Sequence, residues 1–381
     1  MTQLRSEILE SVTRVIDSTR YIQGPEVEAL EAEVAEYSSA DFGIGVSSGT
    51  DALLVSLMSL EIGPGDLVLT TPYSFFATMG AVLRVGAQPV FADIDPRTYN
   101  IDPEQIEFLL QQDTEKKIKA IIPVHLYGQC ADMEKIMAIS ARYKIPVIED
   151  AAQAIGAEVP IDSHAAGWVK AGSLGIAGCF SFFPSKNLGG IGDGGMVVSQ
   201  DADFSTKTRL MRNHGAHPKY YHSLVGGNFR LDPIQATVLR IKLRHLQSWH
   251  ALRMKNAQFY DTCFHDAGLV DQGGVSLPEA VYRKRAENAD EKHNYHIYNQ
   301  YVIRAQRRDE LRDWLSSKDI GTEIYYPLAL HQQECVKNLI DSPLLPHAEQ
   351  AAAETLALPI YPELTQDMQD YVVTSIMQFY R

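Results

Sequence analysis

Cysteine is scarce in this sequence, and the few cysteines lie far apart. The four are Cys130, Cys179, Cys263 and Cys335, and no two of them form a CxxC pair. This spacing indicates neither a zinc site nor a disulfide framework, and it is typical of reduced cytoplasmic thiols. Apolar runs of membrane-spanning length are also missing, and the N-terminus lacks a secretion-signal pattern. We therefore expect a cytoplasmic protein without a metal site or a membrane anchor.

Positive charge is the second deficit. The chain has 34 lysines and arginines against 48 aspartates and glutamates, a formal net charge of −14. Such a chain is not expected to bind nucleic acid or anionic membranes in general. Its 381 residues are 45% hydrophobic and 22% charged. These values are typical of a globular protein with two domains, or with one large domain and an appendage.

One lysine stands out by its position. The stretch CFSFFPSKNLGGIGDGGMVV covers residues 179–198, and Lys186 lies there between an apolar segment at 179–183 and a glycine-rich loop at 189–195. A buried lysine loses its proton more easily and becomes a nucleophile toward a carbonyl group. The plainer alternative is a surface lysine in a hairpin turn.

Two other segments favour a functional role for this lysine. In VIEDAAQAIG, residues 147–156, an apolar run ends in two acidic residues, which predicts a buried parallel strand that delivers Asp150 to the ligand-binding edge of a sheet. In GVSSGTDALL, residues 45–54, a short strand breaks into hydroxyl and glycine residues before a helix, whose N-terminus can bind an anion. The alternatives are a helix cap at Asp150 and an ordinary strand-to-helix turn at 45–54.

Together the three segments supply what pyridoxal 5'-phosphate (PLP) needs from a protein. Lys186 would form a Schiff base with the cofactor, and Asp150 would keep the pyridine nitrogen protonated. The helix start within residues 45–54 would hold the phosphate group.

The glycine loop also contains a pattern that belongs to a different cofactor. Gly190, Gly192 and Gly195 match G-x-G-x-x-G. A dinucleotide site needs a helix after this motif, whereas a strand pattern follows here at 196–198. NAD binding is therefore not expected.

From residue 45 onward, predicted strands alternate with helices, which indicates a mostly parallel sheet covered on both faces. The expected strands cover 67–70, 89–92, 120–124, 146–148, 178–182 and 196–198. Helices are expected at the start of the chain, after Gly24, Asp102 and Asp232, and over 346–356 and 365–380. The charged run at 283–293 is expected to be a solvated hairpin or loop.

The order of several motifs resembles a known family. SSGTDALL, PYSFFAT, VHLYGQ, EDAAQA, FSFFPSKNLGGIGDGG, GGNFRLDPIQA and YYPLALH follow one another along the chain. They resemble the nucleotide-sugar aminotransferases of the DegT type, which are PLP enzymes of fold type I, over nearly the whole chain. The resemblance implies an α/β fold like that of aspartate aminotransferase. It also implies a large PLP-binding domain at 1–240 and a small C-terminal domain at 241–381.

The resemblance assigns roles to individual residues, with Lys186 and Asp150 as the catalytic pair. The residues expected to bind the cofactor are Gly49, Thr50, Asp51, Phe75, Asp150, Gln153, Ser181, Lys186 and Asn228. Phe75 would stack on the pyridine ring, Ser181 would hydrogen-bond the phosphate, and Gln153 would lie near the phenolic oxygen. The residues expected to contact the substrate are Tyr21, Arg230, Tyr326 and His331. Core packing for Phe75 and a structural role for His331 are the plainer alternatives.

Residues 212–230 are polar and aromatic without periodicity, which predicts a long loop. In the family the corresponding loop crosses a dimer interface. Asn228 would then meet the cofactor phosphate of the neighbouring subunit, with Arg230 close by. The resemblance therefore implies a homodimer with shared active sites.

The implied activity is transfer of an amino group from L-glutamate to a UDP- or dTDP-linked keto sugar in amino-sugar biosynthesis. Lys-Asn-Leu-Gly at 186–189, followed by Gly-Asp-Gly-Gly at 192–195, resembles the branch that acts on 3-keto sugars. The 4-keto branch more often has Gly-Asn-Lys and Gly-Glu-Gly-Gly. Two further alternatives are a dehydratase that uses pyridoxamine phosphate, whose branch replaces the lysine with histidine, and a PLP-binding regulator without catalysis.

Overall fold

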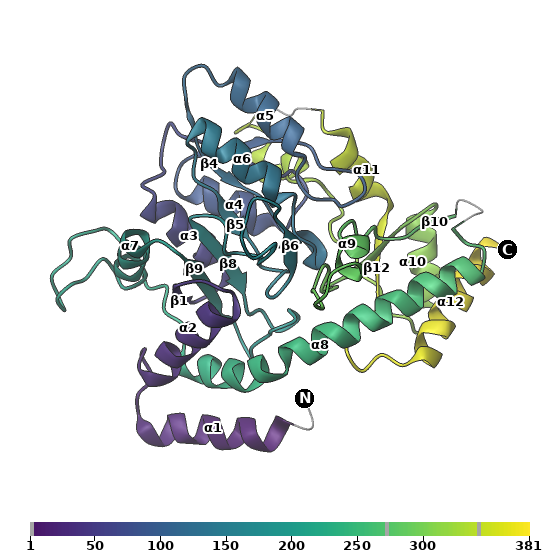
Figure 1. Cartoon of the computed structure of the whole chain (residues 1–381), viewed down its shortest axis with the longest axis horizontal. Helices are drawn as coiled ribbons and strands as arrows, with labels where there is room; N and C mark the ends of the chain where they lie inside the picture. Colours follow the sequence, from purple (N-terminus) through teal and green to yellow (C-terminus); the bar gives the residue numbers. More distant parts are fainter. Residues whose placement is uncertain (1–3, 271–273, 341–343) are drawn as a thin grey trace.

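A sheet of mostly parallel strands lies in the middle of the molecule (Figure 1). The computed structural model of the protein describes residues 4–270, 274–340 and 344–381. One part of the sheet has the strand order β3-β2-β4 and the other has the order β1-β9-β8-β5, and parallel bridges join β4 to β5. Among the described strands of this sheet, β9 alone runs opposite to the common direction of the others, so the expected fold class is confirmed. The strands are β1 (Phe42–Val46), β2 (Leu67–Thr70), β3 (Gln88–Phe91), β4 (Ile118–Ile122), β5 (Ile148–Asp150), β8 (Ala177–Ser181) and β9 (Gly195–Ser199).

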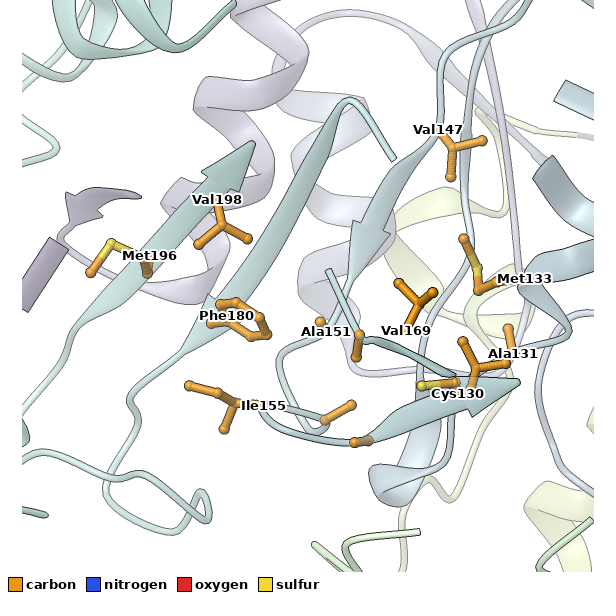
Figure 2. Close-up of a cluster of buried hydrophobic side chains, with 14 of the residues drawn as sticks. Cys130, Ala131, Met133, Val147, Ala151, Ile155, Val169, Phe180, Met196 and Val198 are labelled. Carbon is orange, nitrogen blue, oxygen red and sulfur yellow. The ribbon is translucent and has the colours of Figure 1, made fainter. Parts of the chain in front are cut away.

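Both faces of this sheet are buried. Successive side chains of a strand point to opposite faces, and consecutive apolar side chains of β8 and β9 are buried in different clusters. Phe180 of β8 and Val198 of β9 belong to one apolar cluster (Figure 2). Cys179 and Val197, one residue earlier in each strand, belong to a second cluster with Leu53. The alternation of β8 places Ser181 on the same face as Cys179.

Helices cover the sheet, and three expected helix starts are confirmed. Gly24, Asp102 and Asp232 are N-caps, and each is followed by proline in the first helical position. The helices are α1 (Arg5–Ser18), α2 (Pro25–Tyr37), α3 (Gly49–Ser59), α4 (Phe76–Arg84), α5 (Pro103–Gln112), α6 (Met133–Tyr143), α7 (Ala202–Arg212), α8 (Pro233–Asp266), α9 (Arg283–Glu287), α10 (Arg308–Ser316), α11 (Pro346–Glu354) and α12 (Gln366–Tyr380). Within the described parts of the chain, none of these helices has the length and apolar character needed to cross a bilayer.

Two sequence-based expectations about the C-terminal part are each wrong in part. The helix predicted over 346–356 ends at Glu354, because Thr355–Leu358 pairs with β11 as a fully buried strand, β12. The charged run at 283–293, expected to be a solvated hairpin or loop, begins with the short helix α9 and has no regular structure from residue 288 to residue 293. An ion pair between Arg283 and Glu287, one turn apart, accompanies that helix.

A second, smaller sheet lies in the C-terminal part. Its strands are β10 (Val275–Ser276), β11 (Tyr301–Ala305) and β12, and a separate hairpin is formed by β6 (Glu158–Pro160) and β7 (Trp168–Lys170). The long helix α8 extends from the central sheet to this second sheet (Figure 1). Leu239 of α8 packs in the core of the central sheet, and Tyr260 packs in the core of the second. The division predicted at residue 240 lies within this unbroken helix and stays a prediction.

Asp93 links the two parts of the chain. It lies just after β3 and is almost completely buried. Its carboxylate accepts hydrogen bonds from the backbone N–H groups of His347 (3.0 Å) and Ala348 (3.0 Å), both in the first turn of α11. A side chain more than two hundred residues away thus satisfies donors that helix α11 leaves unpaired at its N-terminus.

We expect the substitution Asp93→Ala to lower the free energy of unfolding by about 1–2 kcal/mol, because it leaves buried backbone donors without a partner. Urea unfolding followed by circular dichroism measures this loss. Asp102→Ala is the matched control, since Asp102 caps its own helix at a more exposed position. A smaller loss for Asp93→Ala than for Asp102→Ala would contradict the linking role.

Candidate active site

A cavity of about 410 Å³ opens where β5 and β8 end and α3 begins. The carboxyl ends of parallel strands are the usual ligand-binding edge of such a sheet. Many of the residues predicted from the sequence line this one cavity. They are Gly49, Thr50, Phe75, Asp150, Gln153, Ser181, Lys186 and Tyr326.

Lys186 lies in a tight turn just beyond β8. Its backbone N–H donates to the carbonyl of Phe183 (2.9 Å), and the glycine loop behind it folds back to the strand through a bond from Gly190 N–H to the Phe182 carbonyl (2.8 Å). Burial lowers the pKa of Lys186 to about 8, although the negative charge of Asp150 opposes the shift. The amine therefore gains and loses its proton close to neutral pH.

The glycine loop packs closely against α8. Gln235 of α8 accepts a hydrogen bond from the Ile191 N–H (2.9 Å). A β-carbon at Gly190 would lie 2.7 Å from the Gln235 amide oxygen. Lys242 of α8 donates to the Gly189 carbonyl. These contacts hold the loop that carries Lys186 against the long helix.

Asp150 is the last residue of β5 and is 4% exposed. Its two carboxylate oxygens accept hydrogen bonds from the Thr78 hydroxyl (2.8 Å) and the Ala152 N–H (3.3 Å). Burial raises the pKa of Asp150 above its ordinary value, while these hydrogen bonds and the charge of Lys186 oppose the rise. The carboxylate is therefore held in place by polar groups and faces a cationic side chain in the same cavity.

The preceding residue, Glu149, points to the opposite face of β5 from Asp150 and fixes the end of that strand by hydrogen bonds. Its carboxylate accepts bonds from the His125 ring (2.8 Å) and from three backbone N–H groups, those of residues 172, 174 and 175. The other His125 ring nitrogen accepts from the Ala131 N–H (3.1 Å), which assigns the ring proton to Nε2. Burial alone would raise the pKa of Glu149, but these bonds lower it below its ordinary value.

The start of α3 forms a shallow cradle. Ser48 caps the helix by accepting from the Asp51 N–H (3.0 Å). A β-carbon at Gly49 would lie 2.6 Å from the Ser181 β-carbon, so only glycine lets the helix start approach β8 this closely. Unpaired backbone N–H groups at such a helix start, beside hydroxyl groups, suit a phosphate. The cradle therefore fits the phosphate of PLP.

An aromatic and amide wall faces the cradle. Gln153 accepts from the Tyr127 N–H (2.7 Å), which fixes its amide so that its nitrogen donates to the Tyr326 hydroxyl (3.0 Å). The Phe75 ring is 57% exposed and lies 6.1 Å from the Tyr326 ring. Burial raises the pKa of Tyr326, so this hydroxyl stays protonated.

Five of the predicted residues do not line this cavity in their own chain: Asp51, Arg230, Tyr21, His331 and Asn228. Asp51 and Arg230 line a neighbouring hollow, where Arg230 donates to Asn213. Tyr21 lies just after α1, and its hydroxyl donates to the Ile16 carbonyl of that helix. His331 is 2% exposed and pairs with Glu349 (3.1 Å).

Asn228, the remaining predicted residue, lies at the base of the loop after α7. It is exposed and pairs with Asn213 across that loop. In Figure 1 the loop projects from the body beside α7. Asn228 is not among the residues lining the cavity of its own chain, and its predicted contact with a neighbouring subunit stays a prediction.

Other residues of the cavity were missed by the sequence analysis. Ser185, Asp193 and Glu323 line it, and Thr78 holds Asp150. Thr78 ends the PYSFFAT motif and follows Ser74, which lies just before α4, by four residues. That spacing is a signal that could have been read from the sequence, whereas Glu323 comes from the C-terminal part and carries no such signal.

Comparison with known proteins gives one consistent result. The model of the DegT/DnrJ/EryC1/StrS aminotransferase family matches residues 2–377. A protein from Geobacillus stearothermophilus named "pleiotropic regulatory protein" is 46% identical, over 100% of this chain and 96% of that protein. A UDP-N-acetyl-3-dehydro-alpha-D-glucosamine 3-aminotransferase from Acidithiobacillus ferrooxidans is 42% identical, over 98% of this chain and 94% of that protein. The crystal structure of S. venezuelae DesV in complex with a ketimine intermediate matches with a TM-score of 0.88 and 36% identity, over 99% of this chain and 95% of that chain.

The lowered pKa of Lys186 predicts that burying this amine reduces the free energy of unfolding by an amount that depends on pH. The folded protein releases this proton near pH 8, but the unfolded chain keeps it to about pH 10.5, so stability gained from this group rises with pH between these values. We expect Lys186→Met to raise the free energy of unfolding of the cofactor-free protein by about 1–3 kcal/mol at pH 7, with a smaller gain at pH 10.

Urea unfolding at the two pH values measures the difference. Lys255→Met provides the control, because Lys255 is an exposed lysine on α8. An equal increase in the free energy of unfolding at both pH values, or a decrease at pH 7, would show that burial of the charged amine does not destabilise the folded protein.

Proposed function

The chain belongs to the DegT/DnrJ/EryC1/StrS aminotransferase family, and from that premise we propose that it transfers an amino group from L-glutamate to a nucleotide-linked 3-keto sugar. It is a PLP-dependent sugar-nucleotide aminotransferase. The finer assignment concerns the donor and the position of the keto group. The observation that carries the proposed PLP-dependent amino transfer is the cavity that holds Lys186, Asp150 and the cradle at the start of α3.

The residues of the cavity supply the chemical groups that PLP needs: an amine, a carboxylate and a helix start that can hold a phosphate. When bound, PLP supplies an electron sink that stabilises negative charge at the carbon carrying the amino group. The start of α3 and Ser181 would hold the phosphate, and Asp150 would hold the proton on the pyridine nitrogen. Phe75 and Gln153 would position the ring.

Lys186 has the properties of a proton carrier in this site. Its pKa of about 8 leaves both protonation states accessible at neutral pH, as general acid–base catalysis requires. Its amine would attach the cofactor before reaction and would move a proton afterwards between substrate and cofactor. The turn and the glycine loop restrict where that amine can reach.

The preference for a 3-keto sugar rests on two observations that agree. The pattern of residues 186–189 and 192–195 resembles the 3-keto branch, and the relative from Acidithiobacillus ferrooxidans is named for 3-amination. A dehydratase of this fold would have histidine in place of Lys186. A purely regulatory protein, as the name of the Geobacillus relative could suggest, would not need the catalytic pair.

The charge of the cavity supports a site completed by a second copy of the chain. Among the described residues that line it, Lys186 is the only cationic side chain, against three acidic ones, Asp150, Asp193 and Glu323. Glutamate and a sugar diphosphate are both anionic and bind best to cationic partners. The loop at 213–228 carries Lys219 and three histidines, and Tyr220 on it is 79% exposed. We propose that this loop enters the active site of the partner in a homodimer.

A panel of substrates tests the proposed reaction. The holoenzyme is mixed with glutamate and with UDP- and dTDP-linked 3-keto and 4-keto sugars, and the position of the new amine is read by NMR. We expect amination at C3, with glutamate converting the bound PLP to pyridoxamine phosphate in the absence of sugar. Amination at C4 would overturn the 3-keto assignment, and an unchanged spectrum with glutamate would overturn the assigned donor.

Complementation between variants tests the shared site. Lys186→Ala and Asn228→Asp are each expected to be inactive, the second because it places a carboxylate near the cofactor phosphate. After subunit exchange of equal amounts, roughly a quarter of the wild-type sites should return, because about half of the dimers are mixed and each mixed dimer has one intact pocket.

The matched control combines Lys186→Ala with Asp150→Asn. Both residues line the cavity of the same chain, so a mixed dimer has one defect in each pocket and should stay inactive. Recovery in the control, or none with Asn228→Asp after confirmed exchange, would contradict the shared arrangement.

A further inference from the structure

A line of hydroxyl groups leads to Asp150 from the side of α4. The Ser74 hydroxyl lies 2.8 Å from the Thr78 hydroxyl, and the Thr78 hydroxyl lies 2.8 Å from one Asp150 carboxylate oxygen. Thr78 is 0% exposed and Ser74 is 3% exposed. The three side chains therefore form one hydrogen-bonded chain that is almost completely buried.

The direction of this chain depends on the charge of Asp150. An ionised carboxylate can only accept, so Thr78 must donate its single proton to Asp150, and Thr78 must then accept from Ser74. If Asp150 were protonated on that oxygen, both hydroxyls would have to turn round. Two aligned hydroxyl dipoles thus favour the ionised form, as hydrogen bonds to a carboxylate do in general.

The remaining contacts of Asp150 leave it free toward the cavity. Its second oxygen accepts a long bond from the Ala152 N–H (3.3 Å). The charged or titratable groups around it are Lys186, His125, Tyr326 and Cys179. In this setting burial works against a negative charge, and Thr78 is the side chain that donates to it directly.

We propose that Thr78, with Ser74 behind it, is a positioning residue that keeps Asp150 ionised and aims its free lone pairs at the cofactor ring. This inference rests on the proposed role of Asp150 as partner of the pyridine nitrogen. Thr78 would not touch the reacting atoms. It would act through Asp150 by setting the charge and the orientation of the carboxylate.

The test compares variants that differ by one hydroxyl group. Thr78→Val removes the donor with little change of shape, and Thr78→Ser keeps it. We expect Thr78→Val to slow the conversion of bound PLP by glutamate by roughly tenfold to a hundredfold, which is the cost of a lost hydrogen bond to a charged group. The rates of Thr78→Ser and wild type should differ by less than about threefold. The rate of Ser74→Ala should lie between those of Thr78→Ser and Thr78→Val.

A pair of hydroxyl groups away from the cavity provides the control for replacing a buried, hydrogen-bonded threonine by valine. Thr208 donates to Ser59 (3.0 Å) in the core away from the cavity, and no carboxylate takes part. Thr208→Val should reduce stability but leave the rate unchanged. A spectroscopic readout is the ¹⁵N shift of labelled pyridine nitrogen in bound PLP. In Thr78→Val this shift should move toward the value found in Asp150→Asn, while PLP stays bound.

A double-mutant cycle separates positioning from packing. If Thr78 acts through Asp150, Thr78→Val should have almost no further effect on the rate in the Asp150→Asn background. An equal slowing in both backgrounds, or a Thr78→Val enzyme with wild-type rate and ¹⁵N shift, would overturn the inference. A wild-type rate for Asp150→Asn would instead overturn the proposed role of Asp150, so the two failures can be told apart.

Discussion

The Lys186 amine and the Asp150 carboxylate carry opposite charges and line the same cavity. The rest of the structure must hold both groups in place. Burial lowers the pKa of Lys186 and raises the pKa of Asp150, and each charge opposes the shift of the other. Holding both groups out of water costs free energy, which only well-placed polar partners can offset. The site is therefore locally unfavourable and depends on a well-packed surrounding frame.

The central sheet and α8 provide that frame. β5 and β8 are adjacent and parallel, so the end of one delivers Asp150 beside the end of the other. Glu149 ties the back of the strand end to His125 and to a turn. On the lysine side, Gln235 and Lys242 of α8 hold the glycine loop. Because α8 also packs against the small C-terminal sheet, the two halves of the molecule share one element that contacts the active site.

Sequence reasoning located the parts of the site that lie within short motifs. Lys186, Asp150 and Gly49 each combine a chemical group with a local strand or helix end, and the structure brings them to one cavity. Contacts between distant segments were not predicted, because nothing local distinguishes them. Glu323 reaches the cavity from the C-terminal part, Asp93 caps α11, and His331 is buried against Glu349. The helix predicted over 346–356 extends two residues into the strand Thr355–Leu358, because the pairing of that strand with β11 is also long-range.

The identity of the lysine that carries the cofactor is the central claim, and one measurement tests it directly. The holoenzyme is reduced with borohydride, digested, and mapped by mass spectrometry. The account predicts the pyridoxyl group on the peptide that contains Lys186, since burial and the Asp150 partner distinguish this amine. A label on another buried lysine such as Lys242, or no covalent label in protein that retains PLP, would contradict it.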